Sequence, residues 1–552
     1  MRLSKLVAGI SAAALLAGPA GAQALESEGA AESQRAAERV RAHITFLASD
    51  LLQGREAGSP GYDIAANYVA SQFAQLGLKP AGANGGYFQP VPLLAARPGD
   101  EGRFVLKGKD GAEVPLVFGE DVMPGKPFGA AERKVSAPLV FVGFGVVAPE
   151  HRRDDYKGLD VKGKIVVVLS GAPAGFQTEE RAYYANGRTK RAQAAAHGAV
   201  GLVSIYLPAD EKRRPFADGK RTWQSWAMTW RKPDGTPADV AIETPQLASL
   251  SVASAAKLFA GAKKTYAEVV EAAEKPKGDP PRFALAASLD ATLRIETKTL
   301  ESANVAGLIE GSDPKLKGEV VVLSAHLDHI GVTPPVRGDG INNGALDNAG
   351  GIATTLEVAR AFQQAGKAPR RSVLVLAVTG EEKGLLGAEY FARNPTMPLS
   401  ALAADVNLDM PILTYDFLDV VAFGAERSSL AGAVRKAAAR EGVALSPDPL
   451  PEEGLFTRSD HFRFVEVGVP STFLMTGFQN GGEAKFRGFL ADCYHKPCDD
   501  LSQGIDYAAG AKFARINYQI AREIADADAR PLWNKGDFFA SKFASPGMIA
   551  DH

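Results

Sequence analysis

The sequence predicts an α/β protein in which helices flank a mostly parallel central sheet, with a separate β-rich unit in an earlier part of the chain. In the C-terminal half, apolar runs typical of strands alternate with runs of helical periodicity. These runs are 320–323, 352–362, 373–378 and 383–392. Such alternation is typical of a parallel sheet covered by helices on both faces. From about residue 113, by contrast, short β-rich runs between turn residues indicate a separate unit.

Length and composition are those of a folded protein with more than one unit. The 552 residues exceed what one hydrophobic core usually serves. Apolar residues make up 46% and charged residues 23%, which excludes a disordered, collagen-like or coiled-coil chain. The net charge of −2 lacks the positive excess that nucleic acids attract, so no nucleic-acid partner is expected. Two cysteines are too few for a disulfide scaffold or an all-cysteine zinc module.

Residues 1–24 have the order of a signal peptide. Arg2 and Lys5 precede the apolar run 6–17, and small residues that fit a cleavage site near Ala24 follow it. The run is too short to span a bilayer, and no later stretch is long and apolar enough to do so. We therefore expect an exported protein, periplasmic or secreted, without an integral membrane segment.

The mature chain divides into the segments 25–112, 113–281 and 282–552, and the Pro- and Lys-rich stretch 275–281 forms a linker. Periodicity in the first segment predicts two helices. Their apolar faces comprise Val40, Ile44, Leu47 and Leu51 in one helix, and Val69, Phe73 and Leu76 in the other. The Gly- and Pro-containing stretch 52–61 predicts a loop between them.

Three of the four tryptophans lie in the polar stretch 207–240. The spacing of Trp223, Trp226 and Trp230 indicates one face of a short helix. We expect these side chains to pack against other elements, and a wall that faces a substrate is the alternative.

Five segments, most of them at the ends of predicted strands, each carry a residue that binds metal ions in proteins. They are His326, Asp347, Glu382, Asp409 and His495. Ligands of open parallel sheets gather beyond the carboxyl ends of the strands. Two imidazoles and three carboxylates suit a pair of Zn²⁺ ions, about 3.5–4 Å apart, with one carboxylate bridging. Each residue also has a structural interpretation, because Asp347 could cap a helix and Glu382 could face solvent at a helix start.

These segments resemble peptidase family M28, a family of zinc aminopeptidases, in their order and spacing. The matching segments are 324–328 (SAHLD), 344–351 (GALDNAGG), 381–387 (EEKGLLG), 407–409 (NLD) and 494–495 (YH). The resemblance covers about 304–500, and the loop 52–61 is similar to the N-terminal part of the family. Residues 155–165 resemble part of a protease-associated (PA) domain. The resemblance implies a zinc-exopeptidase fold of the phosphorylase/hydrolase-like type, with 113–281 as the inserted PA domain.

The resemblance also implies two Zn²⁺ ions per chain and a place for each ligand. One ion would be bound by His326 and Asp409, and the other by Glu382 and His495. Asp347 would bridge the two ions.

Three further residues receive roles from the resemblance. Glu381 would be the general base that activates a metal-bridged water and then the proton donor to the leaving amine. Asp328 would orient His326, and Tyr494 would donate to the oxyanion of the tetrahedral intermediate. A tyrosine that only packs beside the ligand is the alternative for Tyr494.

We interpret the chain as an exported di-zinc exopeptidase that removes N-terminal residues from peptide substrates with a free N-terminus. Three alternatives stay open. A carboxypeptidase or dipeptidase of the same family uses the same metals, and Arg458 near the pocket could bind a carboxylate. A glutaminyl-cyclase-like transferase with one zinc agrees less well with five ligands. A non-catalytic binding protein on a peptidase scaffold agrees less well with a complete set of ligands and base.

Cys493 and Cys498 bracket His495, and the pattern is similar to one that is bridged in secreted members of the family. Two free thiols near the site are the alternative. Two other histidines have an informative context: His329 follows the segment 324–328, and His461 lies in 458–461 (RSDH), which resembles the loop of the family that borders the pocket. We expect His329 to support a ligand or the fold, and His461 to belong to the scaffold of a loop that borders the pocket.

Overall fold

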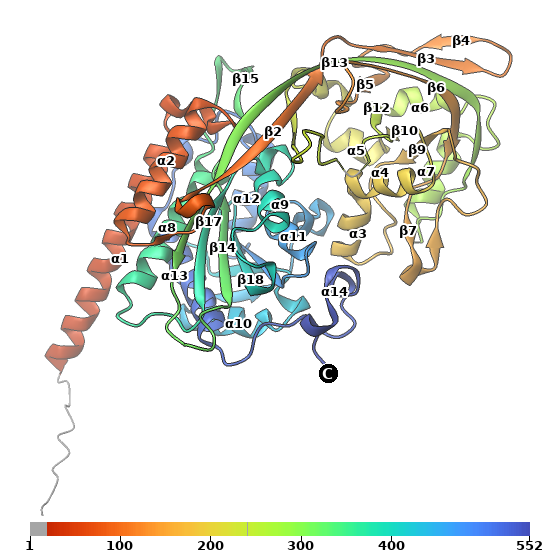
Figure 1. Ribbon diagram of the computed structural model, residues 1–552. Coiled ribbons are helices and arrows are strands. Elements are labelled where there is room, and N and C mark those ends of the chain that lie inside the picture. Colours follow the sequence, from red (N-terminus) through yellow and green to blue (C-terminus); the bar gives the residue numbers. More distant parts are fainter. Residues whose placement is uncertain (1–18, 240, 276, 552) are drawn as a thin grey trace, which may run out of the picture.

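The computed structural model describes residues 19–239, 241–275 and 277–551 (Figure 1). Most of the predicted signal peptide, 1–24, therefore lies outside the described residues. Within these ranges, no helix combines the length and the apolar character needed to cross a membrane.

The larger unit is built on one sheet. Its strands are β1 (Lys79–Pro80), β2 (Phe88–Pro98), β13 (Phe283–Ile309), β14 (Val320–His326), β17 (Ser372–Val378), β18 (Leu402–Leu408), β19 (Asp419–Phe423), β20 (Ala444–Ser446) and β21 (Ser471–Thr476). Hydrogen bonding orders them β2–β13–β17–β14–β18–β21–β19–β20. The central strands β17, β14, β18 and β21 are parallel, whereas β13 runs antiparallel to β17 and β19 to β21. The predicted α/β class with a mostly parallel central sheet is confirmed.

Helices cover both faces of this sheet (Figure 1). On one face lie α1 (Pro19–Leu47), α8 (Gly350–Gln364) and α13 (Tyr507–Asp526), and on the other α9 (Leu386–Arg393) and α11 (His461–Val465). The other helices of this unit are α2 (Pro60–Gln75), α10 (Leu430–Arg440), α12 (Gly482–Asp492) and α14 (Phe538–Phe543). In β14, Val321 faces the core under α8, whereas Val322 packs in the cluster that contains Phe391 and Phe464. Burial on both faces explains why the central strands are continuous apolar runs.

A second sheet belongs to the inserted unit. Its strands are β3 (Arg103–Gly108), β4 (Glu113–Pro115), β5 (Val122–Pro124), β6 (Glu132–Phe141), β9 (Ile165–Leu169), β10 (Gly201–Ile205) and β12 (Gln246–Leu250). Its helices are α3 (Thr178–Ala185), α4 (Gly187–Ala196), α5 (Pro208–Arg213), α6 (Val252–Leu258) and α7 (Tyr266–Glu274). The long strand β13 joins the two sheets, because its first part pairs with β3 and β6 and its last part with β2 and β17. This pairing favours a unit of about 103–294, wider than 113–281.

Two local predictions were wrong. The helix α1 ends at Leu47, and Ser49 caps the next turn by accepting from the N–H of Leu51. Leu51 therefore leaves the apolar face of the helix and is 85% exposed. The tryptophans do not share a helix face either. Trp230 ends the strand β11 (Ala227–Trp230), which returns from the inserted unit to pair with β2, and Trp226 precedes that strand.

The helices α3 and α4 of the inserted unit contact the larger unit. The helix α3 packs against two short 3₁₀ helices, η9 (Pro451–Glu453) and η10 (Leu455–Thr457). Arg427 of the larger unit pairs with Glu179 of α3 and, at 2.8 Å, with Asp537 before α14. In α4, the Nη1 of Arg188 donates to the Oε2 of Glu389 in α9 at 2.7 Å. Charged pairs and the packing of α3 therefore both contribute to the contact between the two units.

The Arg188–Glu389 pair is largely buried. Glu389 is 3% exposed, and its carboxylate also accepts from Arg393 at 3.0 Å. Burial alone would raise the pKa of Glu389, but the hydrogen bonds and charge of Arg188 lower it to about 2. The ionised form of Glu389 therefore stabilises the contact between the units.

Replacing Arg188 by Met should lower the free energy of unfolding at pH 7 by about 2–3 kcal/mol, because Glu389 would stay buried with one partner fewer. The low pKa of folded Glu389 stabilises the protein above the unfolded-state pKa, and this contribution is lost as the pH falls toward about 2. The difference from the wild type should therefore shrink on acidification. Urea unfolding followed by circular dichroism measures both effects. The double variant Arg188→Met, Glu389→Leu should recover part of the loss, and no recovery would contradict the assigned pairing.

Candidate metal centre

The predicted ligands come together at one edge of the central sheet. His326 ends β14, Asp409 follows β18, and Glu381–Glu382 follows β17. Because these strands are parallel neighbours, their carboxyl ends meet at the same edge. Asp347 reaches this edge from the turn before α8, and His495 from the loop after α12. The structure thus assembles all five residues that the sequence analysis assigned as ligands.

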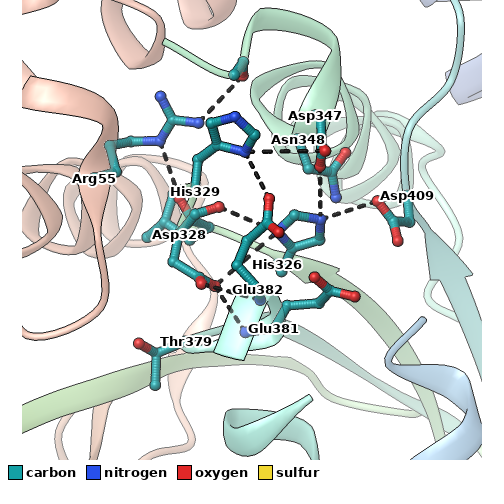
Figure 2. Close-up of polar contacts among 12 residues, drawn as sticks. Arg55, His326, Asp328, His329, Asp347, Asn348, Thr379, Glu381, Glu382 and Asp409 are labelled. Carbon is teal, nitrogen blue, oxygen red and sulfur yellow. Dashed lines mark hydrogen bonds and ion pairs between the residues drawn. The ribbon is translucent and has the colours of Figure 1, made fainter. Parts of the chain in front are cut away.

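The first of two clusters surrounds His326 (Figure 2). Its Nε2 lies 2.9 Å from the Oδ1 of Asp409 and 3.3 Å from the Oδ1 of Asp347. A carboxylate oxygen of Glu381 belongs to the same cluster, since potential ligand atoms of His326, Glu381 and Asp409 lie within 4.8 Å of one another. The residue predicted as the base is therefore beside the predicted ligands.

The second cluster surrounds Glu382. Its Oε2 lies 3.1 Å from the Nε2 of His495, and its Oε1 lies 2.7 Å from the Nδ1 of His329. The Oδ2 of Asp347 is 3.5 Å from the Nε2 of His495. Asp347 therefore turns one oxygen toward each cluster.

Hydrogen bonds from a neighbouring loop hold Asp409. The Oγ of Ser459 donates to the Oδ2 of Asp409 at 2.6 Å, and the Nδ2 of Asn407 donates to that Oγ at 2.6 Å. The Oγ of Ser324 in turn donates to the Oδ1 of Asn407 at 3.0 Å. This chain of buried hydroxyl and amide groups leaves the Oδ1 of Asp409 to face His326.

The turn that carries Asp347 is anchored from two sides. The carboxylate of Asp499 accepts from the N–H groups of Leu346 and Asp347 at 2.9 and 3.0 Å. The buried guanidinium of Arg55 donates to the carbonyls of Asn343 and Gly344 at 2.6 and 3.2 Å. The loop 52–61 therefore supports the site through the side chain of Arg55, which binds backbone carbonyls of the turn before Asp347.

Asp328, which we predicted to orient His326, contacts that ring through its backbone carbonyl and not through its carboxylate. Its backbone carbonyl, at 3.1 Å, is the atom within hydrogen-bond distance of the Nδ1 of His326, whereas its Oδ1 is 4.0 Å away. The carboxylate instead accepts from the N–H groups of Glu381 and Glu382 at 3.1 and 3.4 Å. Asp328 thus fixes the turn that presents the two glutamates.

The electrostatics of the site favour a bound cation. Among the described residues, the ion pairs of Asp347, Glu382 and Asp409 are all with histidines rather than with Lys or Arg. Burial alone would lower the pKa of His326, but the surrounding carboxylates, Asp409 foremost, raise it well above its usual value. The Oε1 of Glu382 is buried without a hydrogen-bond donor. Imidazole and carboxylate donors in this number fit Zn²⁺.

The loop after α12 carries Tyr494 beside His495. The disulfide Cys493–Cys498 is present, which confirms the predicted bridge. The rings of Tyr494 and His495 stack with centroids 3.7 Å apart, and the Nη2 of Arg458 donates to the phenolic oxygen of Tyr494 at 3.3 Å. The bridge closes the short loop that presents both side chains.

A pocket opens beside the two clusters, and its wall is largely apolar. Its apolar lining residues are Met410, Leu455, Phe473, Met475, Phe486 and Leu490. The same pocket is bordered by Glu381, Arg458, Ser459 and Tyr494. An apolar side chain could therefore occupy it while a bond next to that side chain lies near the clusters.

Sequence reasoning missed the residues that support this site from other segments. Ser459 belongs to the loop that was expected to border the pocket, and Asp499 follows the segment 494–495, but nothing in their own pattern shows which backbone or side chain they contact. His329 lies deeper in the site than expected, and its position directly after the segment His326–Asp328 was the available signal. His461, by contrast, packs between Phe456 and Phe473, as expected for a scaffold residue.

Comparisons with known proteins agree with this geometry. The model of peptidase family M28 matches residues 304–521, which contain every predicted ligand. Leupeptin-inactivating enzyme 1 from Streptomyces exfoliatus is 29% identical over 245 residues, which cover 42% of this chain and 51% of that protein. A probable zinc metalloprotease from Pyrenophora tritici-repentis is 42% identical over 76 residues, 14% of this chain and 17% of that protein.

A solved structure shares the fold over most of both chains. An aminopeptidase from Aneurinibacillus sp. strain AM-1 superposes with a TM-score of 0.52 at 19% identity, covering 90% of this chain and 96% of that one. The sequence matches to the Streptomyces and Pyrenophora proteins cover less of this chain than the structural match does. The chain spans about half the length of the Streptomyces protein and a smaller part of the fungal one.

Replacing Ser459 by Ala should weaken metal binding about 10–100-fold, because Asp409 would lose the hydrogen bond that orients it toward His326. Competition with a chromogenic chelator measures the dissociation constants of zinc. Ser471→Ala is the matched control, since this buried hydroxyl donates to the carbonyl of Val469 at the start of β21, away from the clusters. Equal zinc affinities of the two variants would contradict the role given to Ser459.

Proposed function

Since this chain carries a peptidase domain of family M28 over residues 304–521, we propose that it is a zinc-dependent aminopeptidase that holds two ions and acts after export. The position of Asp347 carries the proposal. Its Oδ1 lies 3.3 Å from His326 and its Oδ2 lies 3.5 Å from His495. A carboxylate between two clusters of imidazole and carboxylate groups suits a bridging ligand. A pair of zinc ions supplies Lewis acidity and makes water a stronger nucleophile.

Glu381 is the residue to which we assign proton transfer. Its carboxylate lies beside His326 and Asp409, at the border of the pocket where a peptide bond would be placed. It takes the proton of the attacking water and passes it to the nitrogen of the leaving amine. The carboxylate of Asp328 supports this role, because it holds the N–H groups of both Glu381 and Glu382.

Tyr494 is the residue to which we assign stabilisation of the oxyanion. Its hydroxyl accepts from Arg458, so its own proton is free to be donated toward the pocket. A donor fixed in this way favours the negative charge that develops on the carbonyl oxygen of the peptide bond.

The pocket supports an apolar N-terminal residue as the preferred substrate. Met, Leu and Phe side chains form one part of its wall, and the charged or titratable groups besides Arg458 are those of the two clusters, Asp347, Glu381, Asp409 and His495. The guanidinium of Arg458 already pairs with Glu453 at 3.2 Å and donates to Tyr494. An arginine engaged in this way supports the aminopeptidase over the carboxypeptidase.

The inserted unit and the N-terminal segment complete the proposal. We assign the β-rich unit as a PA domain that limits access to the pocket. Its contact with η9 and η10 supports this, because Leu455 of η10 lines the pocket. The charged, apolar and small residues of 1–24 support export to the periplasm or the medium.

Replacing Glu381 by Gln should reduce the turnover number about 10²–10⁴-fold while zinc content stays at the wild-type level, because the amide cannot carry the proton. Glu382→Gln is the matched variant and should lose zinc instead. Zinc content by mass spectrometry and hydrolysis of aminoacyl-aminocoumarins separate the two effects. Indistinguishable zinc contents would show that the base and the ligand are assigned wrongly.

Acetylation of the N-terminus of a peptide such as Leu-Gly-Gly should reduce its hydrolysis about 100-fold or more, because a free amine makes charge-assisted contacts that the amide lacks. Amidation of the C-terminus should have little effect. Product analysis by liquid chromatography measures both. Cleavage that survives acetylation and is lost on amidation would favour the carboxypeptidase.

A further inference from the structure

His329 is a buried histidine for which the sequence predicts only the support of a ligand or of the fold. It follows the end of β14, and its side chain is fully buried. Its backbone N–H donates to the carbonyl of Arg55 at 3.2 Å. The ring lies against Gly344, where an added Cβ would come within 2.6 Å of the Cγ of His329. The chain thus makes room for this imidazole beside the turn that carries Asp347.

Neither ring nitrogen of His329 has a hydrogen-bond partner among the described residues. Leaving a buried polar group unpaired costs free energy, so such a group requires an explanation. The Nδ1 lies 2.7 Å from the Oε1 of Glu382, which is close enough for a hydrogen bond. The angle of this contact does not suit a hydrogen bond, because the Oε1 of Glu382 lies off the line along which the N–H of the Nδ1 would point.

An ion between the Nδ1 of His329 and the Oε1 of Glu382 accounts for both their short separation and their poor hydrogen-bond angle. Two atoms that bind one ion both point at the ion and not at each other, so they come close with poor hydrogen-bond direction. The Nδ1 of His329, an oxygen of Asp347 and an oxygen of Glu382 lie within 4.8 Å of one another. The Oδ2 of Asp347 is 3.9 Å from this Nδ1 and 3.5 Å from the Nε2 of His495. Both imidazoles therefore face the same two carboxylates.

We propose that His329 is a direct ligand of the ion that Asp347, Glu382 and His495 bind. This inference rests on the proposed two-zinc function. It makes the two positions unequal, because one ion has two imidazoles and the other has His326 alone. A neutral imidazole adds a donor without adding charge, so it strengthens binding at one position. The ion bound by His326 and Asp409 should then be the first to leave on mild chelation.

X-ray absorption of the purified full chain, loaded with zinc, counts the imidazoles per ion without any substitution. Three imidazoles shared by two ions give a mean of about 1.5 per zinc. A mean of about 1.0 with two ions bound would overturn the role of His329 and leave the proposed function standing. Fewer than two bound ions per chain would overturn the proposed function itself.

Zinc titration of the chelator-treated variants is the second test. His329→Ala should weaken one of the two sites about 100-fold or more and leave the other within about threefold of the wild type. His43→Gln is the matched control, because His43 is a buried histidine of α1 that contacts Tyr68. His329→Gln separates the ligand from a hydrogen-bond donor to Glu382. Wild-type affinity at both sites in His329→Gln would overturn the proposal, since an amide can replace a donor.

Discussion

Asp347, Glu382 and Asp409 place their carboxylates at the same edge of the central sheet, and Glu381 adds a fourth. Their mutual repulsion, in a region from which water is largely excluded, is the constraint on which the rest of the site depends. Among the described residues, the ion-pair partners of Asp347, Glu382 and Asp409 are histidines and not Lys or Arg. A bound cation displaces the protons of these imidazoles, which then act as neutral donors, and the cation balances the charge of the carboxylates. Stability of the fold alone does not require four carboxylates to lie this close together, so the arrangement indicates a cation-binding site.

The carboxylates keep their positions because segments far apart along the chain bind the atoms that do not face the clusters. Ser459 holds one oxygen of Asp409, and Asp499 holds the backbone of the turn at Asp347. Asp328 holds the backbone of the Glu381–Glu382 turn. Groups held in this way need little reorganisation when charge develops during a reaction, which is how fixed dipoles favour a transition state.

The inserted unit is connected to this site through packing and charge. The helix α3 rests on η10, whose Leu455 lines the pocket, and α4 pairs with α9, which follows the Glu381–Glu382 turn. Local sequence patterns did not reveal this arrangement. The tryptophan spacing suggested a helix, but pairing with β2 imposed an extended strand at Trp230. In the same way, the cap at Ser49 ended α1 before Leu51 could join its apolar face.

The sequence by itself determined the α/β class and the set of candidate ligands. The reason is that His326, Asp347, Glu382 and Asp409 stand at strand ends or in glycine-containing turns, and parallel strands bring such ends to one edge. For His495 the indication is that its segment, 494–495, resembles the family. Only the tertiary structure decided what supports those ligands. Ser459, Asp499 and His329 contact Asp409, the turn at Asp347 and Glu382 across long stretches of chain. Such contacts depend on packing between elements, so the sequence around Ser459 and Asp499 does not identify their partners, and the position of His329 after His326–Asp328 places it only near the site.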